Sequence, residues 1–466
     1  MMRVLYVFLL LFFFAKVQQA QESQLPENLS GNWFGVLDLS GTPIRLEFTF
    51  NTDGTGVMRS PDQQGGETAL SYLELDQNTL KFGIERIDFG LEATIISTEL
   101  LTGMISQYGM KYNIELTRTP QEVFVKSFPQ TPKAPFPYSS TALSIKNSQA
   151  NVSLAGTLTF GLKDNKNTPI VIMITGSGPQ NRNEEIMGHQ AFWVIADHLA
   201  RQNIASFRFD DRGVGESSGN FSIATSEDFA SDVKSIVAYF KNSEAYADRP
   251  IGLLGHSEGG LVAAMVAAGN PEIDFVVSLA GPGIDGMKIL EKQNKAMMIA
   301  EGMSEESAQK QADFVMSMAK IVVQEKDSIA ARNALKTYLE LHAEPGVIMN
   351  LGGIDQAVNT YNSALNSSWM RFFLSHDPAE DWKKVTCPVL ALNGTVDTQV
   401  EAAANLNAIE FALRRAGNKQ YKVVALKQHN HLFQPSLTGA LSEYGKIEIT
   451  ISDLSLESIS TWINQL

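Results

Sequence analysis

A serine with a glycine two positions away on each side occurs at residues 255–259, which read Gly-His-Ser-Glu-Gly. An apolar stretch at 250–254 predicts a strand before it, and residues 260–268 predict a helix after it. This spacing between a strand and a helix is typical of a sharp turn that holds a serine hydroxyl clear of a sheet. Ser257 is therefore the candidate nucleophile, and the alternative is a glycine-rich turn without a catalytic role.

A serine hydroxyl is a weak nucleophile at neutral pH, and it needs a histidine base that a carboxylate orients. Where the serine lies on such a turn, the acid and then the histidine follow it in the chain. Of the seven histidines, only His429 and His431 lie in the loop that should follow the last predicted strand. Asp397 is the first acid after the strand predicted at 388–392, and Glu401 is the alternative.

Attack by a serine on a carbonyl places negative charge on oxygen, which two aimed hydrogen-bond donors must stabilise. One candidate donor is the backbone N–H of Glu258, and the other should come from the loop 176–179, where Ser177 is favoured and Gly178 is next. We expect no metal and no cofactor. The single cysteine excludes a cysteine-built zinc site, and no phosphate-binding G-x-x-x-x-G-K-[ST] motif accompanies the loop.

Apolar strands alternate with helical segments from about residue 169 onward, a pattern that predicts a parallel sheet with helices around it. The candidate acid follows one of these strands, where catalytic groups gather at the carboxyl edge of such a sheet. Residues 286–373 interrupt the alternation, because they are helical and contain no convincing strand. They are therefore inserted between two strands of one sheet. The segment 210–213, Asp-Asp-Arg-Gly, is expected to lock its loop through hydrogen bonds rather than to bind a metal.

Residues 25–120 have a different pattern. Apolar and polar residues alternate at 44–50, and the turn residues Asn, Asp and Gly follow at 51–56, which predicts a small antiparallel β domain. Four prolines then fall within nine residues of the stretch 121–137. Prolines fix φ and lack an N–H donor, so this stretch is expected to be an extended, semi-rigid linker. The second domain should span 138–466.

This second domain resembles the α/β-hydrolases of the bacterial esterase and serine aminopeptidase S33-like group. The resemblance implies an α/β-hydrolase sheet in which the insertion 286–373 forms a helical cap over the active site, preceded here by the small antiparallel β domain. It also favours His431 over His429 as the base. The matching segments are 175–182 (TGSGPQNR), 209–217 (FDDRGVGES), 255–259 (GHSEG), 387–397 (CPVLALNGTVD) and 430–434 (NHLFQ).

The reaction that these residues and the resemblance imply is serine hydrolysis of a carboxylic ester through an acyl-enzyme. One alternative is a serine peptidase or aminopeptidase on short peptides, which would use the same Ser257, Asp397 and His431. It would need an acid in the inserted helices to bind a free amino terminus, and Glu301, Glu305 and Glu306 are available. An alternative of another class is a non-catalytic ligand-binding protein. The expected partner is a small ester or short peptide.

The first twenty residues resemble a signal peptide. A short basic start precedes an apolar stretch at 4–15, which is too short for an ordinary membrane span, and cleavage is expected after Ala20. We therefore expect an exported protein, periplasmic or extracellular, without stable membrane insertion after cleavage. The chain has 37 basic and 51 acidic residues, a net charge of −14, and no basic run stands out. Nucleic-acid binding is therefore not expected.

Overall fold

The computed structural model describes residues 25–39, 42–62, 67–107, 110–121 and 128–466. The predicted signal peptide, 1–20, lies outside the described residues. The chain divides into two compact units, Met1–Val125 and Lys126–Leu466, and each is described by itself.

The first unit is a nine-stranded antiparallel sheet in the order β4-β3-β2-β1-β9-β8-β7-β6-β5. Its core is apolar and aromatic, with Trp33 fully buried and the rings of Phe48 and Phe82 in edge contact at 5.1 Å. Trp33 is a core residue, since its indole N–H donates to the carbonyl of Leu29 at 2.9 Å. The strands are β1 (Gly31–Leu39), β2 (Thr42–Phe50), β3 (Gly56–Arg59), β4 (Thr68–Ala69), β5 (Tyr72–Asp76), β6 (Thr79–Ile84), β7 (Phe89–Ile95), β8 (Leu100–Gln107) and β9 (Met110–Thr117).

The second unit contains an eight-stranded sheet in the order β10-β11-β15-β12-β16-β17-β18-β19. The six strands from β15 to β19 in this order run parallel, and β11 runs antiparallel to both of its neighbours. With the strand, sharp turn and helix at β16, this is the predicted α/β-hydrolase sheet. The strands are β10 (Ser140–Asn147), β11 (Val152–Thr159), β12 (Ile170–Ile174), β15 (Ala205–Phe209), β16 (Ile251–His256), β17 (Phe275–Leu279), β18 (Val389–Gly394) and β19 (Tyr421–Leu426).

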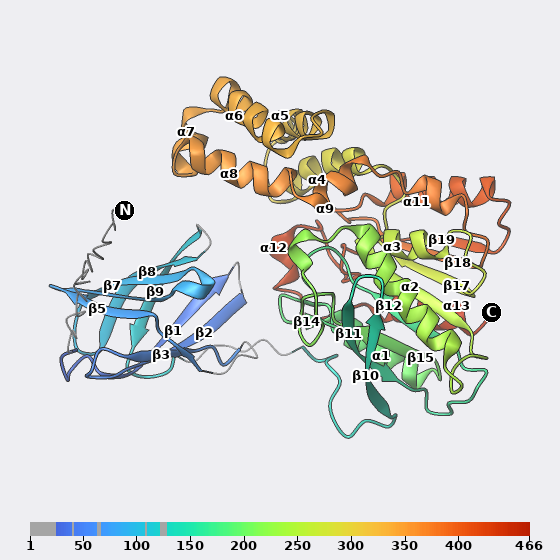
Figure 1. The fold of residues 1–466 in the computed structure, drawn as a ribbon, viewed down its shortest axis with the longest axis horizontal. Coiled ribbons are helices and arrows are strands. Elements are labelled where there is room, and N and C mark those ends of the chain that lie inside the picture. The colour runs from blue at the N-terminus through green and yellow to red at the C-terminus, as the bar shows by residue number, and fades with distance from the viewer. Residues whose placement is uncertain (1–24, 40–41, 63–66, 108–109, 122–127) are drawn as a thin grey trace, which may run out of the picture. The chain divides into compact units, whose positions relative to one another are not determined.

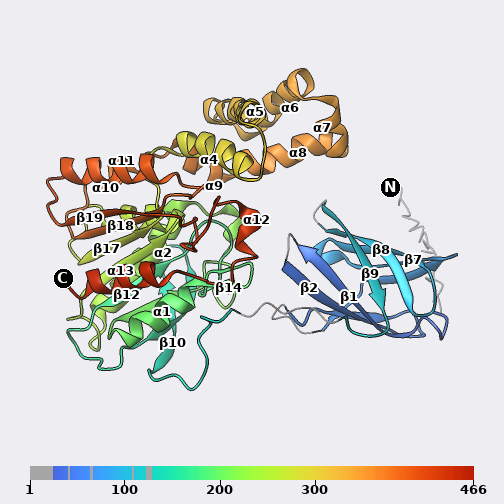
Figure 2. The ribbon, with the colours of Figure 1, turned by 180° about the vertical axis from the view of Figure 1, so that it is seen from behind.

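Helices cover both faces of this sheet, and the alternation of side chains along β12 shows why. Ile172 packs in the core under α2 (Ser226–Asn242), α3 (Glu258–Ala267) and α11 (Ala402–Arg415). Met173 faces the other way, into the core under α1 (Ala191–Arg201) and α13 (Asp453–Ile463). The strands are therefore apolar on both sides, as buried parallel strands are. Figures 1 and 2 show the two helical layers from opposite sides.

The insertion between β17 and β18 is helical, as expected. Its helices pack around their own core, in which Met318 and Leu335 are fully buried. Figure 1 shows them as a separate group above the sheet, with α4 and α9 nearest to it. They are α4 (Gly286–Ala300), α5 (Glu305–Gln324), α6 (Ser328–His342), α7 (Pro345–Asn350), α8 (Ile354–Leu365) and α9 (Ser368–Ser375).

The proline-rich stretch that we expected to be a linker belongs to the second unit from its described start at Phe128. The ring of Phe128 lies edge-on to that of His189, with 4.4 Å between centroids. The side chain of Gln130 accepts from the backbone N–H of Thr450 at 2.7 Å and donates to the carbonyl of Ile451 at 2.8 Å. Apolar and amide side chains between the prolines thus attach this stretch to the domain that follows it.

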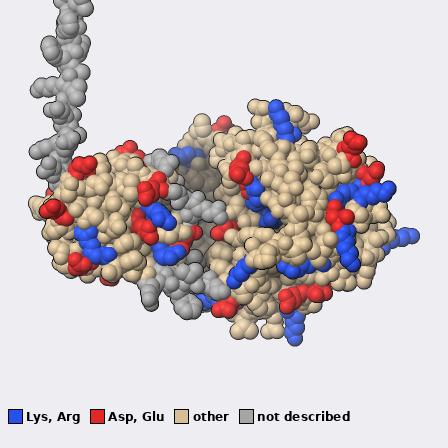
Figure 3. Space-filling view, turned by 90° about the horizontal axis from the view of Figure 1, so that it is seen from below, with Lys and Arg blue, Asp and Glu red and all other residues tan. Residues whose placement is uncertain are grey.

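Charged side chains of both signs share the face of the molecule drawn in Figure 3, where Lys and Arg lie interspersed with Asp and Glu. Among the helices of the described residues, none combines the length and the apolar composition that crossing a bilayer requires.

Candidate active site

Ser257 lies on the sharp turn between β16 and α3 and has φ 53° and ψ −122°. A positive φ is uncommon for a residue with a side chain and is tolerated where the surroundings impose it. Glycine is required at both flanking positions because backbone atoms of neighbouring residues lie where a Cβ would stand. A Cβ on Gly255 would lie 2.0 Å from the carbonyl oxygen of Gly259, and one on Gly259 would lie 2.1 Å from that of Ile174. The spacing in the sequence therefore has a steric cause.

Asp397 and His431 are brought together by the loops after β18 and β19. The Nδ1 atom of His431 lies 2.7 Å from Oδ2 of Asp397, and both side chains are buried. The other carboxylate oxygen of Asp397 accepts from the backbone N–H groups of Gln399 and Val400, at 2.8 and 2.9 Å. A carboxylate held in this way fixes the imidazole with Nδ1 protonated, which leaves Nε2 free to accept a proton.

The two alternatives from the sequence have other partners. The ring of His429 lies 2.8 Å from the carbonyl of Lys427 and 2.8 Å from the hydroxyl of Ser452. Glu401 caps the first turn of α11 by accepting backbone N–H bonds. The structure thus pairs Asp397 with His431 rather than with His429.

His256 connects this pair to the serine turn. It precedes Ser257 in the chain, and its Nε2 lies 2.9 Å from the carbonyl oxygen of His431. The two imidazole rings are 4.8 Å apart between centroids. The hydroxyl of Ser257 has no hydrogen-bond partner within the described part of the chain, and serine–histidine bonds are often loose before substrate binds.

The loop after β12 lies against the serine. A Cβ on Gly176 would stand 3.2 Å from the Cβ of Ser257. The N–H of Gly176 is already used, because it donates to Glu184 at 2.8 Å. The N–H groups of Ser177 and Glu258 have no partner among the residues that the structure describes. These are two of the donors proposed from the sequence. Gly178, the other one, has φ +93°, which favours glycine in this turn.

A buried ion pair beneath the turn was not found by sequence reasoning. Nδ1 of His256 lies 2.9 Å from Glu184, which is 1 % exposed. Burial alone would lower the pKa of His256, but the charge of Glu184 and the hydrogen bonds raise it above its ordinary value. Nδ1 faces the carboxyl of Glu184 and Nε2 faces the carbonyl oxygen of His431, an arrangement that favours the protonated ring. The sequence assigned no role to His256, and no motif marks Glu184.

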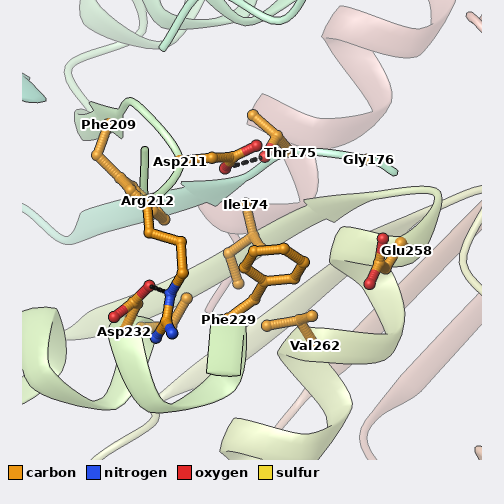
Figure 4. A pocket seen from close by; sticks show the side chains of 11 residues that line it. Ile174, Thr175, Gly176, Phe209, Asp211, Arg212, Phe229, Asp232, Glu258 and Val262 are labelled. Carbon is orange, nitrogen blue, oxygen red and sulfur yellow. Dashed lines mark hydrogen bonds and ion pairs between the residues drawn. The ribbon is translucent and has the colours of Figure 1, made fainter. Parts of the chain in front are cut away.

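Two further carboxyls lie around a cavity of about 10 Å³ beside the turn, which is close to the room that one water molecule needs (Figure 4). Burial raises the pKa of Asp211 to about 8, against the opposing hydrogen bond from the hydroxyl of Thr175 at 2.7 Å. Burial also raises the pKa of Glu258. The carboxylate of Glu258 accepts from the indole N–H of Trp369 in α9 at 2.8 Å, so the inserted helices contact the residue after the serine.

The segment 210–213 has the structural role that we expected. Asp210 binds Arg182 at 2.6 Å, and Arg212 binds Asp232 at 2.7 Å and Asp228 at 2.9 Å. These ion pairs join the loops after β12 and β15 to helix α2. Within the described residues, no three or more His, Cys, Asp and Glu side chains are grouped so that they could hold a metal ion.

Part of the chain matches a known family. Residues 188–329, which include the serine turn and the first inserted helices, match the model of the serine aminopeptidase S33 family. No curated protein matches the chain.

Solved structures of several hydrolases are similar to this chain at low identity. An esterase of Pyrococcus furiosus is 13% identical, with 74% of this chain and 99% of that chain covered and a TM-score of 0.44. Est1E of Butyrivibrio proteoclasticus, with ferulic acid bound, is 17% identical over 70% of this chain and 98% of that chain, with a TM-score of 0.40. A dienelactone hydrolase of Anabaena variabilis is 15% identical, covers 70% and 98%, and has a TM-score of 0.39.

Proposed function

We propose that this chain, an α/β-hydrolase by its fold, is a serine hydrolase that cleaves carboxylic esters. The observation that carries the proposal is the buried pair of Asp397 and His431, at 2.7 Å, beside the strained turn of Ser257. An oriented imidazole next to a serine on a strained turn is the arrangement that activates a serine.

In the proposed reaction, Nε2 of His431 takes the proton of Ser257 while the serine oxygen attacks the ester carbonyl. Asp397 stabilises the imidazolium that forms. The oxyanion accepts hydrogen bonds from the backbone N–H groups of Glu258 and Ser177. His431 then returns its proton to the departing alcohol, which leaves an acyl-enzyme. Water, deprotonated by the same imidazole, attacks the acyl group and releases the acid and the free serine.

A peptidase is the alternative that the family match supports, since the matching model is that of serine aminopeptidases. The acids named for binding an amino terminus do not favour it, because Glu306 is exposed in the first turn of α5 and the other two already have partners. Glu301 is exposed and accepts from the backbone N–H of Ser442 at 3.0 Å, and Glu305 is exposed and pairs with Lys295 at 3.0 Å. We therefore keep the ester as the proposed substrate.

A fluorophosphonate probe tests whether the serine is activated. We expect covalent labelling of the full chain, and no labelling of Ser257→Ala. Unlabelled wild-type protein would leave the non-catalytic binding protein as the better description. A panel of p-nitrophenyl esters and aminoacyl anilides then tests the substrate class. A higher kcat/KM for anilides than for esters would overturn the ester in favour of the peptidase.

A further inference from the structure

A second pocket, of about 270 Å³, lies in the same unit, and no residue assigned to the hydrolysis lines it. It is bounded by the described proline-rich stretch, β10, β11, β15, the start of α1 and the loop after β12. The residues that matter here are Phe136, Tyr138, Arg182, Asn183, Trp193 and Arg208.

Arg208 is a buried cation without a carboxylate partner. It is 5 % exposed, and its one hydrogen bond among the described side chains joins Nη1 to the amide oxygen of Asn183. Its Nε atom is buried without any hydrogen-bond partner in that part of the chain. Burial lowers the pKa of Arg208 to about 10, so the guanidinium is still charged at neutral pH. Buried charges are otherwise almost always paired, because an unpaired one is costly to desolvate.

Arg182, the other cation of the pocket, does have carboxylate partners. Arg182 pairs with Asp210 at 2.6 Å and with Glu216 at 2.5 Å. The charge of Asp210 also acts on Arg208, but Asp210 forms its ion pair with Arg182. The guanidinium of Arg208 therefore lacks a directly paired carboxylate, and the carboxylate of a ligand would supply one.

Three aromatic rings form part of the wall, beside the hydroxyl side chains of Ser140, Thr157 and Thr159. The rings of Phe136 and Tyr138 are stacked, with centroids 5.6 Å apart, and Phe136 lies 6.2 Å from the ring of Trp193. The guanidinium carbon of Arg208 lies 5.9 Å from the centroid of Trp193. Flat apolar walls beside a cation favour a ligand that has a planar ring next to its charged group.

We propose that this pocket is a binding site for a small aromatic carboxylate. Its carboxylate pairs with the guanidinium of Arg208, which lines the pocket. Its ring lies against Trp193 and Phe136. The site is separate from Ser257, so occupation does not require the hydrolytic reaction.

Calorimetric titration of the full chain with benzoate tests the proposal. Ser257→Ala protein is titrated as well, so that the result does not depend on the reactivity of the serine. We expect one benzoate per chain in both. Arg208→Met should weaken binding by at least about tenfold, because charge-assisted hydrogen bonds are lost. Arg414→Met, which removes an exposed arginine of α11, should leave the affinity unchanged.

Further titrations separate the carboxylate and the ring. Trp193→Leu should weaken benzoate more than acetate, and it gives a second variant should Arg208→Met fail to fold. Absence of benzoate binding to the wild type, or equal affinity in Arg208→Met, would overturn the site. Inorganic phosphate that binds as tightly as benzoate, and also through Arg208, would overturn the assignment of an aromatic carboxylate.

Discussion

The imidazole of His431 has one carboxylate partner, and this pairing gives the most direct prediction at the level of single side chains. We expect Ser257→Ala, Asp397→Asn and His431→Ala each to lower kcat for p-nitrophenyl esters by roughly 10⁴–10⁶-fold with the fold intact. His429→Ala is the matched control, because its ring bonds to Lys427 and Ser452 instead. Loss of activity in His429→Ala with activity retained in His431→Ala would show that the base is misassigned.

Asp211 predicts a pH dependence of stability. Its pKa is about 8 in the folded protein and 3.8 as a model value, so between these values the folded state binds more protons than the unfolded state. Stability therefore falls as pH rises through this window. Glu258 and His256, whose pKa values are also raised, act in the same direction.

As pH rises from about 4 to about 8, the free energy of unfolding should fall less for Asp211→Asn than for the wild type. The difference between the two falls should be on the order of several kcal/mol. Denaturant titrations across this range measure it. Asp313→Asn, at an exposed carboxylate on α5, is the control and should follow the wild-type curve. A variant curve parallel to that of the wild type would mean that Asp211 is ionised throughout.

Among the elements, the inserted helices are the ones that we expect to affect substrate selection. Trp369 of α9 contacts Glu258, so the insertion reaches the serine turn. Met318 is fully buried within the insertion, whereas Met297 and Met298 of α4 are half-buried. We expect Met318→Ala to lower stability by about 2–5 kcal/mol without reordering the ester panel.

Met297→Ala and Met298→Ala should instead change the ranking of esters by kcat/KM, because side chains of a cap wall the substrate pocket. Melting temperature and the ester panel are measured on the same variants. A ranking that stays the same in both would contradict the role of α4 as part of a cap, and labelling of Ser257 by the probe should survive in either case.

For the molecule as a whole, the two compact units predict that the second folds without the first, because it has its own cores. A chain that begins at Lys126 should be soluble and have the esterase activity of the full protein. A chain that begins at Tyr138 should melt at a lower temperature, since it lacks the contacts of Phe128 and Gln130. Limited proteolysis should cut before Phe128. Equal melting temperatures for the two truncations would refute this role for residues 128–137.

Export is proposed from the first twenty residues. Expression in a bacterial host that has a periplasm should give a mature chain beginning at Gln21, which intact-mass measurement detects. A secreted or periplasmic product that retains Met1 would contradict cleavage after Ala20.

Local sequence patterns predicted the parts of the fold that depend on local chemistry. Buried parallel strands such as β12 are continuous apolar runs, and the serine turn has its own spacing, so both were predicted. β10 and β11 were missed. β10 is an edge strand with several exposed positions, so it lacks an apolar run.

In the candidate site, the paired acid and histidine follow strand ends and were therefore named in advance. The partnership of Glu184 with His256 was not, because it joins positions 72 residues apart and depends on burial. Burial also decides the protonation of Asp211, and no sequence pattern reports it.

The inserted helices begin and end at the same place: Gly286 at the start of α4 packs so closely on Phe373 of α9 that a Cβ there would lie 2.0 Å from its carbonyl oxygen. A segment whose ends meet closes its own loop, and the entropy of closing a loop grows only by about 0.6 kcal/mol for each doubling of length. The free energy of pairing β17 with β18 thus depends little on the length of the segment between α4 and α9. Evolution can lengthen, shorten or exchange α5 to α8 and so vary the range of substrates that the protein accepts. The sheet and its serine turn can stay the same.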